Sequence, residues 1–268
     1  MHLVPAGLAA SVIGTLVVGP ASAYDTSRIE DPQVHARAAR ALPAHTAHPV
    51  QRVEIIGRNG GVREALRELY WKRTEDNDSR VMVRIVEPVD ERGVAVLVNG
   101  DADRKQTSCM SHSPKLKQVR PVTGESCFGN ILASDFTYED FSNFHRVDER
   151  EQVTRRDEAV LDDHAVYVPE ADQPGDNAHY RRVRSYIDQA FCLPMLTEFF
   201  AHNGDLRKEL LAARDSVKQH GARWVPYGVP MIVHERGTRS IFEAESVAID
   251  PGRHDAMFEM QASKTGNS

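Results

Sequence analysis

The sequence predicts a mainly β (α+β) fold built on a single curved antiparallel sheet. Two observations support this fold class. Short apolar stretches alternate with a period of two residues, as half-buried strands do. Turn signals separate these stretches at steady spacing without intervening long helices, which favours strands that pair with their chain neighbours. A strongly curved sheet of this size must fill or cover its concave face.

Most elements of this sheet follow from local patterns. Period-two or β-rich strands and the turns between them are expected at Val53–Ile56, Asn59–Gly61, Glu75–Asp78, Val81–Val86, Asn99–Asp101, Ala165–Pro169, Tyr180–Ile187, Leu196–Phe200, His202–Asp205, Val229–Val233 and Ser240–Ile249. Two stretches are ambiguous. Apolar residues in Val62–Arg73 and Leu206–Lys218 also fit one face of a helix, so local pattern alone does not decide between helix and strand.

The segment Phe128–Phe144 interrupts the strand pattern. Its large apolar residues have irregular spacing and are interleaved with carboxylates, which predicts a loop with one or two helical turns whose aromatic residues cover an apolar surface. Ser134 or Asp135 is predicted to cap the short helix, because either side chain can accept the unpaired N–H groups of a first turn. The segment is interpreted either as a buried connection between strands or as a lid over a hydrophobic cavity.

The two ends of the chain have a different composition. Residues 1–23 contain the apolar run Leu3–Val18 followed by Ala21-Ser22-Ala23, the pattern of a cleaved secretory signal peptide. The alternative is a membrane anchor, but the run is shorter than the ~20 residues that span a bilayer. We therefore expect export to the periplasm. Residues 24–48 are expected to be helical or irregular, and residues 263–268 a disordered tail.

The cysteines are interpreted in the light of this compartment. Cys109 and Cys127 flank a hairpin-like region, and an oxidising compartment favours a disulfide between them. Two unbridged thiols are the alternative. Cys192 is expected to stay unpaired.

Catalytic and metal-binding patterns are weak. Ser126 lacks a nucleophile-elbow context, the Cys109/His112 pair has no second pair of ligands, and His234-Glu235 is not followed by a second histidine at helical spacing. The net charge of −6 gives no basic surface for nucleic acid. The chain is therefore predicted not to be an enzyme, and no cofactor or metal is expected.

Several motifs resemble the outer-membrane lipoprotein-sorting (LolA-like) proteins of Gram-negative bacteria. The match lies in Pro114–Arg120 (PKLKQVR), Ser126–Gly129 (SCFG) and Ser134–Phe141 (SDFTYEDF), with weaker agreement at Tyr180–Asp188 and Trp224–Pro226. The resemblance covers about residues 49–262 and implies strands at both ambiguous stretches. It further implies an unclosed β-barrel in which short helices cover the hydrophobic concave face.

The resemblance also implies a function. The chain would be a periplasmic carrier or receptor for a lipid or a lipoprotein acyl chain, a monomer, with an inner-membrane transporter as a candidate partner. Alternation and the inward face of the family select the expected ligand-binding residues, which are Trp71, Val83, Ile85, Val96, Phe136, Phe141, Phe199 and Met231. The alternative function is a non-catalytic envelope scaffold or an accessory subunit of a membrane transporter.

Overall fold

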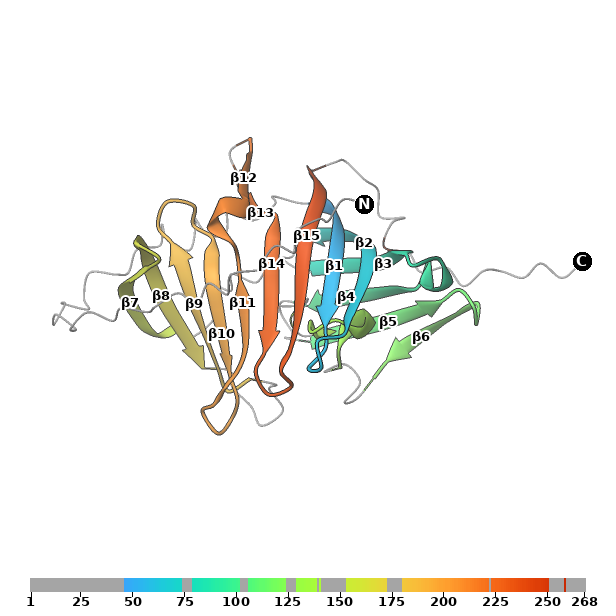
Figure 1. Ribbon diagram of the computed structural model, residues 1–268, viewed down its shortest axis with the longest axis horizontal. Coiled ribbons are helices and arrows are strands. Elements are labelled where there is room, and N and C mark those ends of the chain that lie inside the picture. Colours follow the sequence, from blue (N-terminus) through green and yellow to red (C-terminus); the bar gives the residue numbers. More distant parts are fainter. Residues whose placement is uncertain are drawn as a thin grey trace, which may run out of the picture.

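Strands dominate the computed structural model (Figure 1). The structure describes residues 46–73, 79–101, 106–123, 129–138, 140, 153–172, 180–221, 223–250 and 258. The strands are β1 (Thr46–Ile56), β2 (Val62–Arg73), β3 (Ser79–Glu87), β4 (Ala95–Asp101), β5 (Gln106–Ser113), β6 (Gln118–Val122), β7 (Val153–Leu161), β8 (His164–Asp172), β9 (Arg182–Asp188), β10 (Pro194–Phe200), β11 (Leu206–Leu211), β12 (Val217–His220), β13 (Arg223–Pro226), β14 (Gly228–Val233) and β15 (Thr238–Ile249). Three short 3₁₀ turns lie at Val89–Glu91, Ile131–Ala133 and Arg214–Ser216.

Thirteen of these strands form one antiparallel sheet in the order β6-β5-β4-β3-β2-β1-β15-β14-β11-β10-β9-β8-β7. β1 joins the two halves of the chain, because it pairs with β2 on one side and with β15 on the other. In Figure 1 the strands from β7 to β1 run nearly upright, whereas β3 to β6 lie across them, so the sheet turns strongly along its width. The edges β6 and β7 are not neighbours in the sheet order. The predicted curved, unclosed antiparallel sheet is confirmed.

The ambiguous stretch Val62–Arg73 is a strand along its whole length. It pairs with β1 from Val62 opposite Ile56 to Lys72 opposite Thr46, and with β3 on its other side. The turn that connects β1 to β2 contains Gly60 at φ +79°, a left-handed conformation that glycine adopts without steric cost. A central position between two strands thus overrides the helical spacing of its apolar residues.

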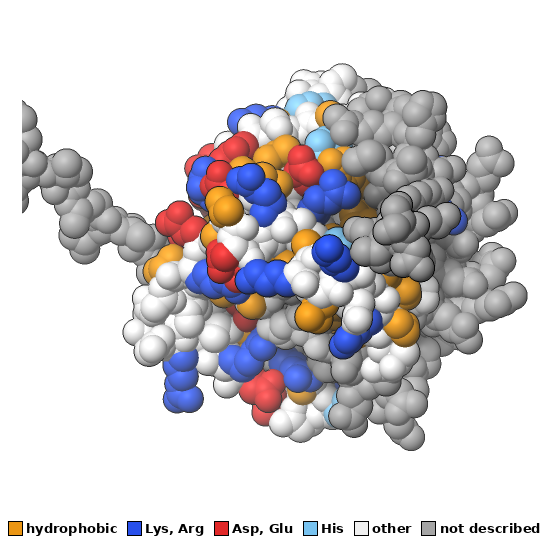
Figure 2. All heavy atoms as spheres, turned by 90° about the vertical axis from the view of Figure 1, so that its right-hand side faces the viewer, with side chains coloured by type: hydrophobic (Ala, Val, Ile, Leu, Met, Phe, Trp, Pro, Cys, Tyr) orange, Lys and Arg blue, Asp and Glu red, His pale blue; other side chains and the backbone are white. Residues whose placement is uncertain are grey.

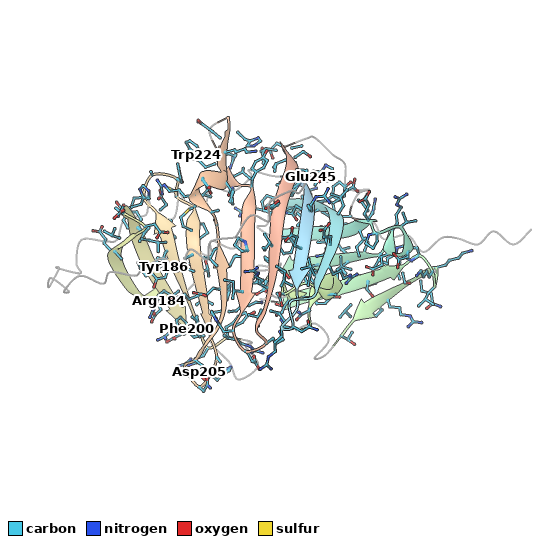
Figure 3. All side chains as sticks on the ribbon, in the orientation of Figure 1. Arg184, Tyr186, Phe200, Asp205, Trp224 and Glu245 are labelled. Atoms are coloured by element: carbon cyan, nitrogen blue, oxygen red, sulfur yellow. The ribbon has the colours of Figure 1, made fainter. Side chains whose placement is uncertain are left out.

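The second ambiguous stretch is a strand only in part. β11 ends at Leu211, a 3₁₀ turn follows, and the prediction of one strand through Lys218 is therefore wrong. Residues from Val217 onward form a separate two-stranded hairpin of β12 and β13. Trp224 of this hairpin packs its ring at 4.7 Å from that of Phe191, so the hairpin covers the β9–β10 connection (Figure 3).

The expected turn at Asn99–Asp101 is wrong, because these residues belong to β4 and pair with β5. Strand β7 was not predicted from the sequence. β7 pairs with β8 through a two-residue turn, Asp162-Asp163, in which both residues have left-handed φ angles of 49° and 64°. Such a turn matches the twist of the flanking strands, and aspartate tolerates the left-handed region better than most residues. β7 is an edge of the sheet, and edge strands commonly carry charged side chains. The strand was missed because its charged composition does not resemble that of a buried strand.

The register divides the side chains of the sheet between two faces. The inner face carries the largest apolar cluster, which contains Ala47, Val53, Trp71, Val81, Val83, Val96, Val98, Cys109, Val229, Met231 and Phe242. The outer face of β2–β4 carries a smaller cluster with Tyr70, Met82, Ala95 and Leu97, against which Phe258 packs. Both faces of this part of the sheet are therefore covered.

The outer face of β8–β10 is held by charged and aromatic side chains. Arg184 Nε donates to Glu170 at 2.7 Å, and Tyr186 donates to Glu198 at 3.2 Å. The Cζ atom of Arg184 lies 5.2 Å from the ring centroid of Phe200. Arg184, Tyr186 and Phe200 lie along the same region of β9 and β10 in Figure 3. These contacts connect adjacent strands across the sheet.

The surface seen from the β5–β6 side is mixed in charge. Figure 2 shows basic and acidic side chains interspersed with small apolar areas on this side. No helix among the described residues is long and apolar enough to cross a membrane.

Candidate functional site

The inner face brings most of the predicted ligand-binding residues together. Trp71, Val83, Val96, Phe136 and Met231 belong to one buried apolar cluster, and none is more than 3% exposed. Ile85 is equally buried and follows Val83 at a spacing of two on β3, so it lies on the same face.

Phe199 also lies on the inner face but is not part of this cluster. It is half-buried, opposite Lys208 in the register and with its ring 4.8 Å from that of Tyr180. Phe141 lies outside the described residues. Binding of a ligand by this set remains a prediction.

Residues 129–138 and 140, the cover segment, lie against the inner face. Ile131 is fully buried, and the ring of Phe136 meets that of Phe242 edge-on, with centroids 4.5 Å apart. Tyr138 belongs to the same cluster. In Figure 1 the segment is the short olive-green coil near the lower ends of β1 and β2. The side chains of Ile131, Phe136 and Tyr138 are buried against the sheet, whereas Ala133 at the turn is exposed.

Internal hydrogen bonds give the cover segment its irregular path. Ile131 N donates to Phe136 O at 2.7 Å, and Asn130 Nδ2 donates to Ser134 O at 2.6 Å. Leu132 and Ala133 have left-handed φ angles of 49° and 57°. The chain therefore reverses within a few residues and directs Asp135 toward β15.

Asp135 binds the β14–β15 hairpin, and the prediction that it caps a helix is wrong. Its carboxylate accepts hydrogen bonds from Thr238 Oγ1 at 2.6 Å, Ser240 Oγ at 2.9 Å and Arg236 Nη2 at 3.1 Å. Its backbone N–H also donates to Ser240 Oγ at 2.9 Å. Asp135 thus fixes the middle of the cover segment to the sheet.

The helical turn after Asp135 is capped by a different pair. Thr137 N donates to Asp140 Oδ2 at 2.7 Å, and Asp140 N donates to Thr137 Oγ1 at 3.2 Å. This reciprocal arrangement is a capping box with an aspartate in the third position after the cap. Thr137 occupies the cap because its side chain can reach the N–H three residues later, whereas Asp135 is already bound to the hairpin.

Asp140 also makes a buried ion pair with Lys208 of β11. Tyr180 completes the group, since Lys208 Nζ donates to Tyr180 Oη at 2.9 Å and Tyr180 Oη donates to Asp140 Oδ1 at 3.0 Å. The side chains of Lys208 and Asp140 are only 4% and 3% exposed. The pair fixes the end of the cover segment to the inner face.

Burial and pairing act in opposite directions on Lys208. Removal from water lowers the pKa of its ammonium, and the carboxylate of Asp140 raises it. The desolvation effect is the larger, so the pKa lies below 10.5. The buried pair therefore makes stability sensitive to pH.

Arg67 makes a third contact with the cover segment. Its Nη2 donates to Leu132 O at 2.6 Å, and its Cζ lies 6.0 Å from the ring centroid of Phe242. The side chain is buried on the inner face, opposite Ile85 in the register. Burial, followed by repulsion from Arg63, lowers the pKa of its guanidinium to about 10, so it is still charged at neutral pH.

Arg67, Lys208 and Tyr180 were not predicted as site residues. A signal for the two cations was present, because each occupies an inward position of its strand between apolar residues. Arg67 lies two residues before Leu69, and Lys208 two residues before Leu210. A charge at an inward position predicts a buried partner or a ligand. For Tyr180 we see no comparable signal.

The predicted disulfide has only one described partner. Cys109 is buried in the apolar cluster of the inner face, and Cys127 lies outside the described residues, so this bridge remains a prediction. The predicted signal peptide also lies outside them. Within the described ranges, no three His, Cys, Asp or Glu side chains group together in a way that could hold a metal ion.

Comparisons with known proteins agree with this geometry. A family model described as "Uncharacterized protein" matches residues 77–264. A comparison with curated proteins gave no match. Among solved structures, a DUF1329 family protein from Desulfovibrio piger is similar with a TM-score of 0.74 and 20% identity, covering 85% of this chain and 95% of that one.

Two further structures share the fold. A domain assigned to an outer-membrane lipoprotein-sorting protein of Vibrio parahaemolyticus has a TM-score of 0.73 and 20% identity, covering 84% of this chain and 94% of its own. A LolA superfamily protein from Nitrosomonas europaea has a TM-score of 0.65 and 18% identity, covering 85% and 96%. The fold is therefore LolA-like.

Proposed function

The chain belongs to the family whose model, described as "Uncharacterized protein", matches residues 77–264, and from this premise we propose that it is a periplasmic carrier or receptor that binds a lipid or a lipoprotein acyl chain. The ligand would lie between the inner face and the cover segment. The periplasmic location rests on the predicted signal peptide. The LolA-like fold of the similar structures supports a carrier without catalysis.

One observation carries the proposal, namely the way in which the cover segment is attached. Among the described residues, every hydrogen bond between this segment and the rest of the protein involves at least one side chain, namely that of Arg67, of Asp135 or its partner Ser240, or of Asp140. The segment can therefore separate from the sheet without breaking any ladder between strands. Beneath it lies a continuous apolar surface contributed by β1–β5, β14 and β15.

The energetics of such a site need no catalytic group. Each buried CH₂ of an acyl chain contributes ~0.8 kcal/mol, so a long chain can replace the contacts that Ile131 and Phe136 make with the sheet. A ligand would bind by taking the place of these side chains on the apolar cluster. The buried polar contacts would then set the cost of opening.

The same packing favours a second candidate function. Ile131 and Phe136 are buried against the inner face, as expected for a non-catalytic envelope scaffold or an accessory subunit of a membrane transporter. In that case the cover segment would be a permanent part of the hydrophobic core. The two functions differ in whether the inner face ever accepts a ligand.

Native mass spectrometry of protein purified from the periplasm separates the two functions. We expect an adduct with the mass of a lipid or fatty acid that survives buffer exchange, together with saturable binding of a fluorescent fatty acid after delipidation. Protein without an adduct and without saturable binding would contradict the carrier and leave the scaffold.

A further inference from the structure

Among the described residues, two buried cations lie on the inner face, and only Lys208 is paired there with a carboxylate. Lys208 is neutralised by Asp140. Arg67 is 1% exposed, and its one hydrogen bond among the described residues goes to the neutral carbonyl of Leu132. Its Nε and Nη1 atoms are buried and have no hydrogen-bond partner in the described part of the chain. A buried charged group with unused donors is costly, so this arrangement calls for a further partner.

The residues around Arg67 do not supply this partner. Arg63 lies four residues before Arg67 on the same face of β2 and repels it. Glu91 forms an ion pair with Arg63, and it attracts Arg67 less strongly than Arg63 repels it. The ring of Phe242 compensates the charge only in part, because a cation–π contact at 6.0 Å lies at the limit of its range. The region beside Arg67 therefore keeps a net positive charge at neutral pH.

We infer that the ligand carried on the inner face is an amphiphile with an anionic head group, carboxylate or phosphate, that binds Arg67. The inference rests on the proposed carrier function and adds a ligand class to it. Anionic oxygens are the strongest acceptors for guanidinium N–H groups. From Arg67 the inward residues Leu69 and Trp71 of β2 and Val83 of β3 lead into the apolar cluster, so the acyl chain would extend along them.

The test compares ligands that share one chain and differ in head group. Dissociation constants of oleate, oleoyl lysophosphatidate and oleyl alcohol are measured below their aggregation limits on the full delipidated protein. A charge-assisted hydrogen bond predicts that at least one anionic ligand binds about 10- to 100-fold more tightly than the alcohol. The stronger of the two anions identifies carboxylate or phosphate as the preferred head.

Variants assign the preference to Arg67. Arg67→Met is expected to reduce the advantage of the anion to less than about 3-fold, whereas Arg67→Lys retains part of it. Arg63→Met is the matched control, since it removes a neighbouring inward cation that already has Glu91, and it should leave the preference intact. If Arg67→Met does not fold, the comparison of the three ligands on the unmodified protein still tests whether an anionic head group is preferred.

The outcomes separate the inference from the proposed function. Equal affinity of the unmodified protein for anionic and neutral ligands would overturn the inference and leave the carrier. An anion preference that persists in folded Arg67→Met would also overturn it. Failure of all three ligands to bind would remove the carrier itself.

Discussion

Asp140→Ala is expected to lower the free energy of unfolding by about 3–5 kcal/mol, because it leaves the buried ammonium of Lys208 without its carboxylate. It also removes the acceptor for Tyr180 and one half of the capping box with Thr137. Urea unfolding followed by tryptophan fluorescence measures the loss. The cover segment would lose its attachment to β11, so the fatty-acid on-rate should rise in the folded fraction.

The surface pair Arg52–Glu245 is the matched control for this change. Both side chains are 44% exposed, and Glu245, labelled in Figure 3, lies on β15. Glu245→Ala should cost less than about 1 kcal/mol, since exposed ion pairs contribute little. Adding Lys208→Met to Asp140→Ala should recover part of the lost stability by removing the unpaired charge. Equal losses of unfolding free energy in Asp140→Ala and Glu245→Ala would contradict a stabilising role of the buried Asp140–Lys208 pair.

The ion pair also predicts the direction of a pH effect. Because the pKa of Lys208 is lower in the folded protein than 10.5, the unfolded chain binds more protons between the two pKa values. Stability contributed at this site should therefore rise with pH across that window. The difference in unfolding free energy between the unmodified protein and Lys208→Met is the quantity to follow.

Phe136→Ala should also cost about 3–5 kcal/mol, the range for a buried Phe that is replaced by Ala. Phe136 is 3% exposed and packs edge-on against Phe242. Phe199→Ala is the control, because this residue lies on the same face but is half-buried, and its loss should be about half as large. Urea unfolding and fatty-acid uptake are measured on both variants.

The combination of the two measurements is decisive for Phe136. A large loss of stability together with uptake by the unmodified protein fits a cover segment that is packed when empty and displaced by ligand. A large loss without uptake by the unmodified protein would leave the scaffold function. A small loss of stability would contradict the buried position of this ring.

The strands of the sheet were predicted from the sequence more successfully than the polar contacts that attach the cover segment to the sheet. Val62–Arg73 could be assigned as a strand through family resemblance, and the apolar alternation along β3 placed Val83 and Ile85 on the same buried face. The end of β11 at Leu211 was missed, because the following residues pair locally with β13 rather than with the main sheet. The hydrophobic period of a single stretch does not determine which strand it pairs with.

The polar contacts could not be predicted because their partners are remote in sequence. Asp135 and Ser240 are 105 residues apart, and Asp140 and Lys208 are 68 apart. In the local sequence, the nearest apparent partner for each carboxylate is the N-terminus of a short helix. For this reason Asp135 was wrongly predicted to cap a helix. Only the sheet order, which places β11, β14 and β15 beside one another, makes these partners accessible.

The most direct test of the central claim is photolabelling with a diazirine fatty acid, mapped by peptide mass spectrometry. The alternation of β2 and β4 supplies internal controls, since Trp71 and Val96 face inward and Tyr70 and Leu97 face outward. If the ligand binds between the inner face and the cover segment, label should appear on Trp71, Val96 or Met231 and be displaced by unlabelled fatty acid. Label on Tyr70 or Leu97, or no displaceable label at all, would contradict the account.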